Sequence, residues 1–448
     1  MPNDMTHSEY ATALQAIVDE GAAALTSTPA PLEPAAVEID HGRALTALGH
    51  LVKVLDKKTP APVLRGVLIR HDGSDLRVTA TDMDLRGDAY FSTGTGGAPW
   101  AAVVDAAALH KVLMKTKGKA PAVRLEPVAD AGETGVVVTI GKTRVTLGSV
   151  APVSDFPTAG PLNDDRAFAL GASIVSRPAL ADLFTRPAFA ISNEETRYYL
   201  NGLYLHLPGA CGRNGAESTD TDGRYTLRAV ATDGHRLARF DSEIRLPGMT
   251  GRETVRHLPD GRRVRSLRDD AGQIVPRKAV QIIGKLLTAR GAPDLAGLEF
   301  TPSACRVSVD CVSIAAKAVD GAFPDYTRVT PAGDAHFALD RADLAGALPA
   351  VQIVHDSGAK AVKMTIGAAG GTVTATGTTG TAEQAFGAEI IADGGDHATG
   401  FNADYLANVL ASFKAADRVY MTQAGAGDPA RFEAPGDALA VVVMPMRV

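Results

Sequence analysis

The chain has 448 residues, of which 45% are hydrophobic and only 5% aromatic, and its formal net charge is −6. This length exceeds what one hydrophobic core can serve and suits three domains, whose cores must be built mainly from aliphatic side chains. The acidic balance argues against an open-faced nucleic-acid binder, and three cysteines without framework spacing fit a reducing compartment.

Residues 1–36 precede the patterned part of the chain. A possible helix at Ala11–Leu25 leads into a linker-like stretch rich in Pro and Thr, which predicts a flexible extension, with a partner-binding helix as the alternative. The N-terminus has neither a basic start nor an apolar core, and no apolar run approaches membrane-spanning length. The sequence therefore predicts a cytoplasmic protein without a signal peptide.

Three copies of one pattern follow in order. Each begins with a short alternating strand and a small amphipathic helix, and continues with a strand pair whose second strand reads LRVTATD, LRAVATD or GTVTATG. Thr81, Thr232 and Thr376 hold the same position in the three copies. Self-similarity over so long a period predicts three related domains rather than a solenoid of short repeats.

Each copy has a second half, made of another helix and further alternating strands. Helix-start signals stand at Asp105, Pro276 and Asn402. We therefore predict an α+β chain of three tandem similar domains, each with two helices and antiparallel sheets. The predicted domains are residues 37–165, 166–333 and 334–448.

The second copy is the longest because it carries two insertions, near residues 208–224 and 248–272. The first is a polar loop rich in Gly, Asp and Thr, and the second is rich in arginine. We interpret the second as a solvated surface loop. An electrostatic contact with a nucleic acid or a partner protein is the alternative.

The sequence contains no strong catalytic motif. It lacks a phosphate-binding GxxxxGK[ST] loop as well as HExxH, CxxC and GxSxG motifs. The best candidates for chemistry are Asp233 and His235, which could hold a metal or act as an acid–base pair. Because no further ligand cluster stands near them, the sequence favours a turn with a partner-contact surface, and it predicts no enzyme, no metal and no cofactor.

Positive charge gathers on the predicted helices. The helix regions around Lys53, Lys111 and Lys285 carry several cations and few acids, while much of the acid lies in strands and turns. One positive surface on an acidic protein would give a weak, sequence-independent attraction to phosphates, and ordinary solvated helix faces are the alternative. If such helices lined a closed ring, weak attraction would suffice, because topology would prevent escape.

Several long stretches match a known family. They are RYYLNG at Arg197–Gly202, VATDGHRLA at Val230–Ala238, VPRK at Val275–Lys278, FPDYTRVTP at Phe323–Pro331, GFNADYL at Gly400–Leu406 and VVMPMRV at Val442–Val448. In these stretches the chain resembles the bacterial β sliding clamp, the processivity subunit of the replicative DNA polymerase, in register over about residues 37–448. The resemblance implies a non-enzymatic homodimer that closes head to tail as a ring around duplex DNA without sequence preference.

The resemblance also implies partners. An ATP-dependent clamp loader would open the ring, and the replicative polymerase and other proteins with clamp-binding motifs would dock in a pocket between domains 2 and 3. The residues implied for that pocket and its flanks are Leu200, Thr232, Gly234, His235, Arg236, Leu237, Pro324, Arg328, Val329, Asn402, Tyr405, Val442, Met444, Pro445, Met446 and Arg447.

Two further sets of residues follow from the resemblance. Cations would meet phosphates and tyrosines would pack on bases or sugars, and the residues implied for DNA are Lys58, Tyr198, Tyr199, Arg277 and Lys278. The implied dimer joint pairs Val145 and Leu147 with the partner subunit's Ile353 and Val354. The alternatives to a clamp are a metal-dependent hydrolase using Asp233 and His235, and a monomeric β-rich scaffold that binds peptides without closing.

Overall fold

The computed structural model describes most of the chain. The described residues are 34, 36–56, 58–94, 97–116, 122–130, 133–158, 173–208, 224–247, 253–257, 263–267, 272–301, 303–355, 360–392 and 395–448. The predicted helix at Ala11–Leu25 and most of the insertion near residues 208–224 lie outside the described residues.

Contacts divide the chain into two units. The first consists of the described residues of Met1–Thr46, Pro60–Val78 and Tyr90–Phe156, and the second of those in Ala47–Thr59, Thr79–Ala89 and Pro157–Val448. Elements with residues in both are α2 (His41–Leu51), β3 (Asp75–Thr81) and β4 (Leu85–Ser92). The three tandem domains stay a prediction from the repeated pattern.

The first unit holds a four-stranded antiparallel sheet in the order β1-β6-β7-β8. Its strands are β1 (Val37–Asp40), β6 (Ala122–Asp130), β7 (Glu133–Ile140) and β8 (Thr143–Leu147). Separately, β2 (Gly66–His71) pairs with β5 (Trp100–Asp105), and the helices are η1 (Pro62–Arg65), α3 (Ala106–Lys115) and η2 (Val153–Asp155).

The second unit contains a nine-stranded sheet in the order β15-β10-β11-β12-β27-β26-β25-β19-β23. Its strands are β10 (Gly202–His206), β11 (Arg224–Thr232), β12 (Arg236–Pro247), β15 (Gln273–Pro276), β19 (Phe337–Asp340), β23 (Ala388–Ile390), β25 (Arg418–Thr422), β26 (Ala430–Glu433) and β27 (Leu439–Val443). At its centre β12 and β27 pair antiparallel, with Leu237 opposite Val442. This pairing brings the last strand of the chain against the strand that follows the second repeat's turn.

The second unit contains two more sheets of four or more strands. Leu85–Ala89 of β4 pair with β18 (Val312–Lys317), and β17 (Ala304–Val309), β16 (Leu295–Thr301) and β9 (Ser173–Ser176) follow in that order. The other sheet has the order β22-β21-β20-β24. Its strands are β20 (Ala361–Gly367), β21 (Gly370–Gly377), β22 (Gly380–Phe386) and β24 (His397–Asn402).

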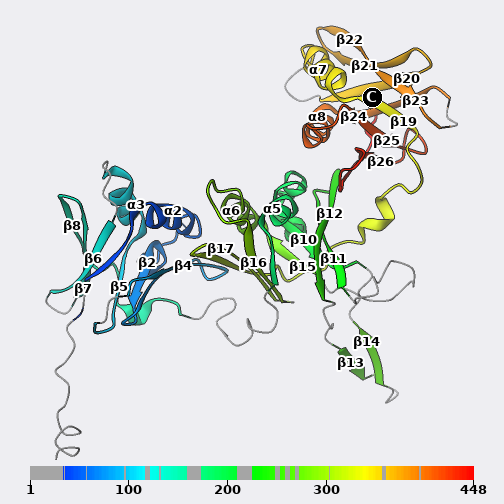
Figure 1. Cartoon of the computed structure of the whole chain (residues 1–448). Coiled ribbons are helices and arrows are strands. Elements are labelled where there is room, and N and C mark those ends of the chain that lie inside the picture. The colour runs from blue at the N-terminus through cyan, green and yellow to red at the C-terminus, as the bar shows by residue number, and fades with distance from the viewer. Residues whose placement is uncertain are drawn as a thin grey trace, which may run out of the picture. The chain divides into compact units, whose positions relative to one another are not determined.

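The helices of the second unit pack in pairs. They are α5 (Arg177–Thr185), α6 (Arg277–Leu287), α7 (Arg341–Gln352) and α8 (Ala403–Ser412), with the short 3-10 helices η3 (Ala188–Ala190), η4 (Glu195–Leu200) and η5 (Tyr326–Val329). Figure 1 shows α5 beside α6, and α7 contacts α8 in the same way. At Gly284 of α6 an added Cβ would lie 3.1 Å from Thr185, so a side chain there would press on α5.

The predicted helix starts are confirmed. The Asp105 carboxylate accepts from the backbone N–H of Ala108 at the start of α3, and the Asn402 side chain caps α8 in the same way. Pro276 stands directly before α6, where its missing N–H costs nothing. These local signals work because they satisfy backbone groups that a helix end leaves unpaired.

The prediction of a plain surface loop in the arginine-rich insertion needs correction. Within residues 248–272, β13 (Glu253–His257) and β14 (Arg263–Leu267) form an antiparallel pair. The sequence between them contains Pro-Asp-Gly, and both runs contain β-branched residues, which together are the signal of a hairpin.

Among the described residues, no helix combines the length and apolar character that crossing a bilayer would require.

Candidate functional site

A cavity of about 160 Å³ opens where the turn after β11, the end of β27 and η5 come together. We call it the seam pocket, and its lining consists of Leu200, Thr232, Gly234, Arg236, Leu237, Pro324, Asp325, Tyr326, Val329, Val442 and Met444. Sites for drug-sized ligands usually span roughly 300–1,000 Å³. The seam pocket is therefore suited to one or two side chains of a peptide rather than to a whole small molecule.

The turn beside the seam pocket is held by its own side chains. Thr232 Oγ1 accepts from the Gly234 N–H and donates to the Arg236 carbonyl, while Asp233 Oδ1 accepts from the N–H groups of His235 and Arg236. Gly234 has φ of +90°, and a Cβ there would lie 2.7 Å from Arg197 Nη1. Only glycine meets both conditions without strain, and the resulting turn has one shape.

Arg236 presents one free donor in the wall of the seam pocket. Its Nε donates to Asp233 Oδ2 at 2.9 Å and its Nη2 to the Phe189 carbonyl at 2.8 Å. Its guanidinium carbon lies 5.4 Å from the ring centroid of Phe189 and 4.6 Å from that of Tyr405. Burial, followed by the charge of Asp233, raises the pKa of the Tyr405 hydroxyl.

The remaining nitrogen of that guanidinium, Nη1, is buried and has no hydrogen-bond partner among the described residues. A buried donor left unpaired costs roughly 1–3 kcal/mol, and a ligand that brings an oxygen acceptor recovers it. The seam pocket therefore combines a mostly apolar lining with an arginine that keeps one guanidinium nitrogen unpaired.

Asp233 and His235 do not form an acid–base pair. Asp233 bonds to the backbone of His235 and to the Arg236 guanidinium, not to the His235 ring. That ring stacks on Tyr405 with 6.3 Å between centroids, and the His235 carbonyl accepts from Met444 N–H. Across the part of the chain that the structure describes, no group of three or more His, Cys, Asp or Glu side chains could hold a metal ion.

Several residues expected at the pocket lie outside its lining. They are His235, Arg328, Asn402, Tyr405, Pro445, Met446 and Arg447. Asn402 caps α8, Tyr405 packs on Arg236, and Met446 N–H donates to the Gly400 carbonyl, which holds the last residues against β24. Asp325 and Tyr326 line the pocket although we did not single them out, and their signal was the FPDYTRVTP stretch that contains them.

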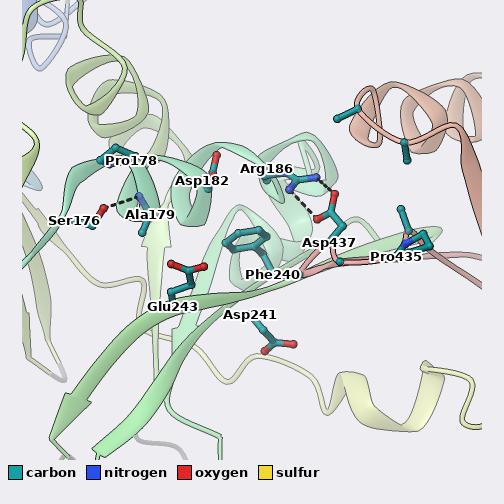
Figure 2. Close-up of a pocket in the computed structure, with 15 residues that line it drawn as sticks. Ser176, Pro178, Ala179, Asp182, Arg186, Phe240, Asp241, Glu243, Pro435 and Asp437 are labelled. Carbon is teal, nitrogen blue, oxygen red and sulfur yellow. Dashed lines mark hydrogen bonds and ion pairs between the residues drawn. The ribbon is translucent and has the colours of Figure 1, made fainter.

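A second and larger cavity of about 480 Å³ lies beside α5, and we call it the α5 pocket. Figure 2 shows the Arg186 guanidinium turned toward the Asp437 carboxylate in its lining. Arg186 Nη1 and Nη2 donate to the two Asp437 oxygens at 2.8 and 2.7 Å, and Nη2 also donates to the Ser412 carbonyl at 3.0 Å. The residues predicted for peptide binding are absent from its lining, and this ion pair joins α5 to the turn between β26 and β27.

The residues predicted to meet DNA lie on η4, on α6 and near α2. Tyr198 and Tyr199 of η4 meet edge to face with 5.8 Å between centroids, and Tyr198 is 54% exposed. Arg277 and Lys278 open α6, and Lys58 is exposed.

Two further cations, outside the predicted DNA set, lie near each other. Burial lowers the pKa of Lys53, and the positive charge of Lys285 lowers it further. A phosphate between two such ammonium groups would relieve their repulsion.

The residues predicted for the dimer joint lie at strand and helix ends. Val145 and Leu147 belong to β8, the last strand of the first unit's four-stranded sheet. Ile353 and Val354 follow α7, and Ile353 is 80% exposed.

No protein-family model matches the chain. It is 31% identical over 417 residues to the β sliding clamp of Caulobacter vibrioides, which covers 92% of this chain and 99% of the relative. The Escherichia coli K12 β sliding clamp is 27% identical over 411 residues, or 89% of this chain and 98% of the relative. The chain belongs to the β sliding clamp family. It is therefore a non-catalytic processivity clamp of DNA polymerase.

Solved structures agree with this assignment. The Caulobacter crescentus β sliding clamp matches with a TM-score of 0.74 and 29% identity, over 93% of this chain and 100% of the other. The sliding clamp of Bartonella birtlesii bound to griselimycin matches with a TM-score of 0.73 and 28% identity, over 92% and 99%. The predicted α+β fold with antiparallel sheets is therefore confirmed.

Proposed function

We propose that two copies of this chain join head to tail into a ring around duplex DNA, and that the seam pocket tethers the replicative polymerase by a short peptide. The ATP-dependent clamp loader and other proteins with clamp-binding motifs would use the same pocket in turn. The processivity function of the family requires a clamp that stays on DNA while holding its enzyme. Encirclement supplies the first property and a small peptide site the second.

The seam pocket is the observation that carries the peptide-binding part of the proposal. Leu237 and Val442 give it an apolar base, and the Arg236 Nη1 donor can meet a peptide carbonyl or an amide side chain. Met444 at the rim is 38% exposed, and the flexible thioether chain of methionine adapts to partners of different shape.

Free strand edges support ring closure. Among the described strands, β8 pairs only with β7, and β22 pairs only with β21, so each presents an unpaired edge. Such edges favour pairing with another strand, and a head-to-tail dimer that joins β8 to the partner's sheet would use them. We propose that Val145 and Leu147 of β8 then pack near the partner subunit's Ile353 and Val354.

The proposed contact with DNA is electrostatic. Lys58 and Arg277 supply positive charge, and Tyr198 and Tyr199 supply rings that can pack on sugars or bases. Lys278 is ion-paired with Asp82, so it would have to exchange that carboxylate for a phosphate. None of these groups reads a base edge in the way that sequence-specific binders do. Weak attraction of this kind allows sliding, because no phosphate is held for long.

Peptide binding is tested with a labelled clamp-binding peptide from the cognate polymerase and fluorescence anisotropy. Deleting Met444–Val448 should abolish binding and leave the dimer mass intact in light scattering. Met444→Lys, which places a charge at the exposed rim, should weaken binding at least tenfold without risk to the core. Lys414→Ala, on the exposed surface after α8, is the control. Unchanged affinity in both pocket variants would refute the proposed site.

Encirclement is tested by topology. After loading by the clamp loader, the protein should remain on nicked circular DNA and leave linear DNA through its ends. Equal retention on the two substrates would contradict the ring, as would a solution mass equal to one chain at micromolar concentration.

A further inference from the structure

A short strap forms one wall of the seam pocket. It runs from Phe323 to Val329, includes η5, and contributes Pro324, Asp325, Tyr326 and Val329 to the lining. The Tyr326 ring is only 7% exposed and packs with Val230, Leu237 and Val442. Tyr326 therefore belongs both to the pocket wall and to the core beneath it.

The Tyr326 hydroxyl lies between two partly buried polar side chains. Its oxygen is 3.0 Å from Arg228 Nη1 and 3.1 Å from His206 Nε2. A guanidinium can only donate, so the hydroxyl accepts from Arg228, and its own proton can point to His206 Nε2 when that nitrogen carries no hydrogen. Arg228 is in turn fixed by an ion pair with Asp241.

The state of His206 agrees with this arrangement. Burial, and then the positive charge of Arg228, lowers the pKa of the His206 ring from 6.5 to about 3. At neutral pH the ring is therefore uncharged, and its Nε2 can accept the Tyr326 proton when Nδ1 carries the ring hydrogen. Burial lowers the pKa of Arg228, but the interactions of its guanidinium with Tyr326 and Asp241 are stronger in sum, so the pKa is raised.

Ring stacking holds the beginning of the strap. Tyr204 stacks on Phe323 with 4.7 Å between ring centroids and an interplanar angle of 4°. The Tyr204 ring also stacks on His206, with 4.8 Å between centroids. The His206 ring, which is hydrogen-bonded to the Tyr326 hydroxyl, thus also supports Phe323 through Tyr204. The hydrogen bond and the stack depend on the same placement of His206.

We propose that Tyr326 is the positioning residue of the seam pocket. Its hydroxyl, held between Arg228 and His206, sets the distance of the strap from Leu237 and Val442, and so decides which apolar peptide side chains fit. The inference rests on the proposed peptide-binding function. It adds that peptide selectivity depends on a polar network behind the pocket wall, which the peptide never touches.

The first test compares Tyr326→Phe with the native protein in peptide titrations. The change keeps the ring but leaves Arg228 Nη1 and His206 Nε2 without their partner, so the strap loses its anchor. We expect roughly tenfold weaker binding, mostly through faster dissociation, because related complexes differ mainly in that rate. Preference between peptides carrying Leu and Phe at the buried position should shift toward Phe as the pocket loosens. Tyr420→Phe, on β25, is the matched control.

The second test changes the acceptor instead of the donor. His206→Gln keeps an oxygen that can accept from Tyr326 and should bind peptide nearly as well as the native protein, whereas His206→Leu should reproduce the loss and the changed preference. This pair keeps the test valid if Tyr326→Phe folds poorly. A role in stability alone would lower the melting temperature and leave the Leu-to-Phe preference unchanged.

The outcomes separate the two proposals. If Tyr326→Phe and His206→Leu both fold and bind each peptide with native affinity, the positioning role is wrong. If the Met444→Lys variant binds peptide with native affinity, the proposed peptide site is wrong. That result would not contradict the hydrogen-bond network around Tyr326.

Discussion

Lys278 donates from its ammonium group to the Asp82 carboxylate at 2.5 Å, and also to the Val54 carbonyl at 2.5 Å. The other Asp82 oxygen accepts from the backbone N–H groups of the turn that follows β3. Asp233 in the second repeat has the same arrangement, with one oxygen on its turn and the other on Arg236. The two repeats therefore use one aspartate position to shape a turn and to hold a cation.

We expect Lys278→Met and Asp82→Asn each to destabilise the fold. Because the Lys278 side chain is 40% exposed, solvent screens the pair, and a double-mutant cycle should give a coupling of about 0.5–1 kcal/mol in urea unfolding. The more exposed Lys360–Asp404 pair is the control and should couple less. Equal coupling in both pairs would show that the Val54 carbonyl and partial burial add nothing.

The turn glycine of the second repeat should resist substitution. Gly234→Ala forces a side chain into positive φ and toward Arg197, and should cost at least 1 kcal/mol while weakening peptide binding. Gly346→Ala in α7, where a Cβ meets open space, is the control and should stabilise by about 1 kcal/mol. Thermal unfolding measures both, and a neutral Gly234→Ala would contradict the strained turn.

The first repeat predicts the opposite change at the matching position. Met83 occupies the place of Gly234 and has φ of +83°, a conformation that costs a non-glycine residue roughly 1 kcal/mol or more. Met83→Gly should therefore be neutral or slightly stabilising in spite of the greater freedom of glycine in the unfolded chain. A loss above about 1 kcal/mol would mean that the exposed Met83 side chain makes a contact of its own.

Breaking the ion pair in the α5 pocket should be costly. The Arg186 and Asp437 side chains are 25% and 19% exposed, and Asp437→Asn leaves a partly buried guanidinium with one charged partner fewer. We expect a loss of about 1–2 kcal/mol in denaturant unfolding. Arg186→Lys should lose nearly as much, because lysine cannot bond both oxygens in the same geometry. A Lys variant of native stability would show that charge alone matters.

Lys53, just after α2, and Lys285 of α6 should affect the salt dependence of DNA binding. Each phosphate contact contributes about 0.9 to the slope of log affinity against log salt, so Lys53→Ala with Lys285→Ala should lower that slope by about 1–2. Lys363→Ala on β20 is the control. Binding to short duplexes at several salt concentrations measures the slopes, and an unchanged slope would exclude these two lysines from the DNA surface.

Acid should destabilise the fold through His206. Its pKa is about 3 in the folded protein and about 6.5 in the unfolded chain, so below pH 6.5 the unfolded chain takes up a proton that the folded chain refuses. Above pH 6.5 the His206 ring is neutral in both states and does not reduce the free energy of unfolding. As the pH drops from 6.5 toward 3, the free energy of unfolding falls by up to about 1.4 kcal/mol per pH unit because of this residue. His206→Gln should flatten the pH dependence of unfolding, and His50, lowered to about 4, should account for part of the remaining slope.

The sequence alone was sufficient for features that depend on near neighbours. The helix starts at Asp105 and Asn402 follow from capping, since the acceptor and the N–H groups it satisfies are two or three residues apart. Most residues of the seam-pocket lining lie in stretches of sequence that resemble the family, such as VATDGHRLA with Leu237 and VVMPMRV with Val442. The hairpin at β13 and β14 was missed because its charge concealed a weak turn signal.

Only the tertiary structure decided which distant residues work together. Tyr326 lies 98 residues from Arg228 and 120 from His206, and β12 meets β27 across an even longer stretch of chain. No local pattern encodes such distances, because a hydroxyl or an arginine has the same propensity wherever its partner lies. The helix ends and the clamp family were therefore present in the order of residues, and the three tandem domains stay a prediction from the repeated pattern. The single donor of Arg236 and the anchored strap arose only when burial removed water and left each polar atom to find a partner in the fold.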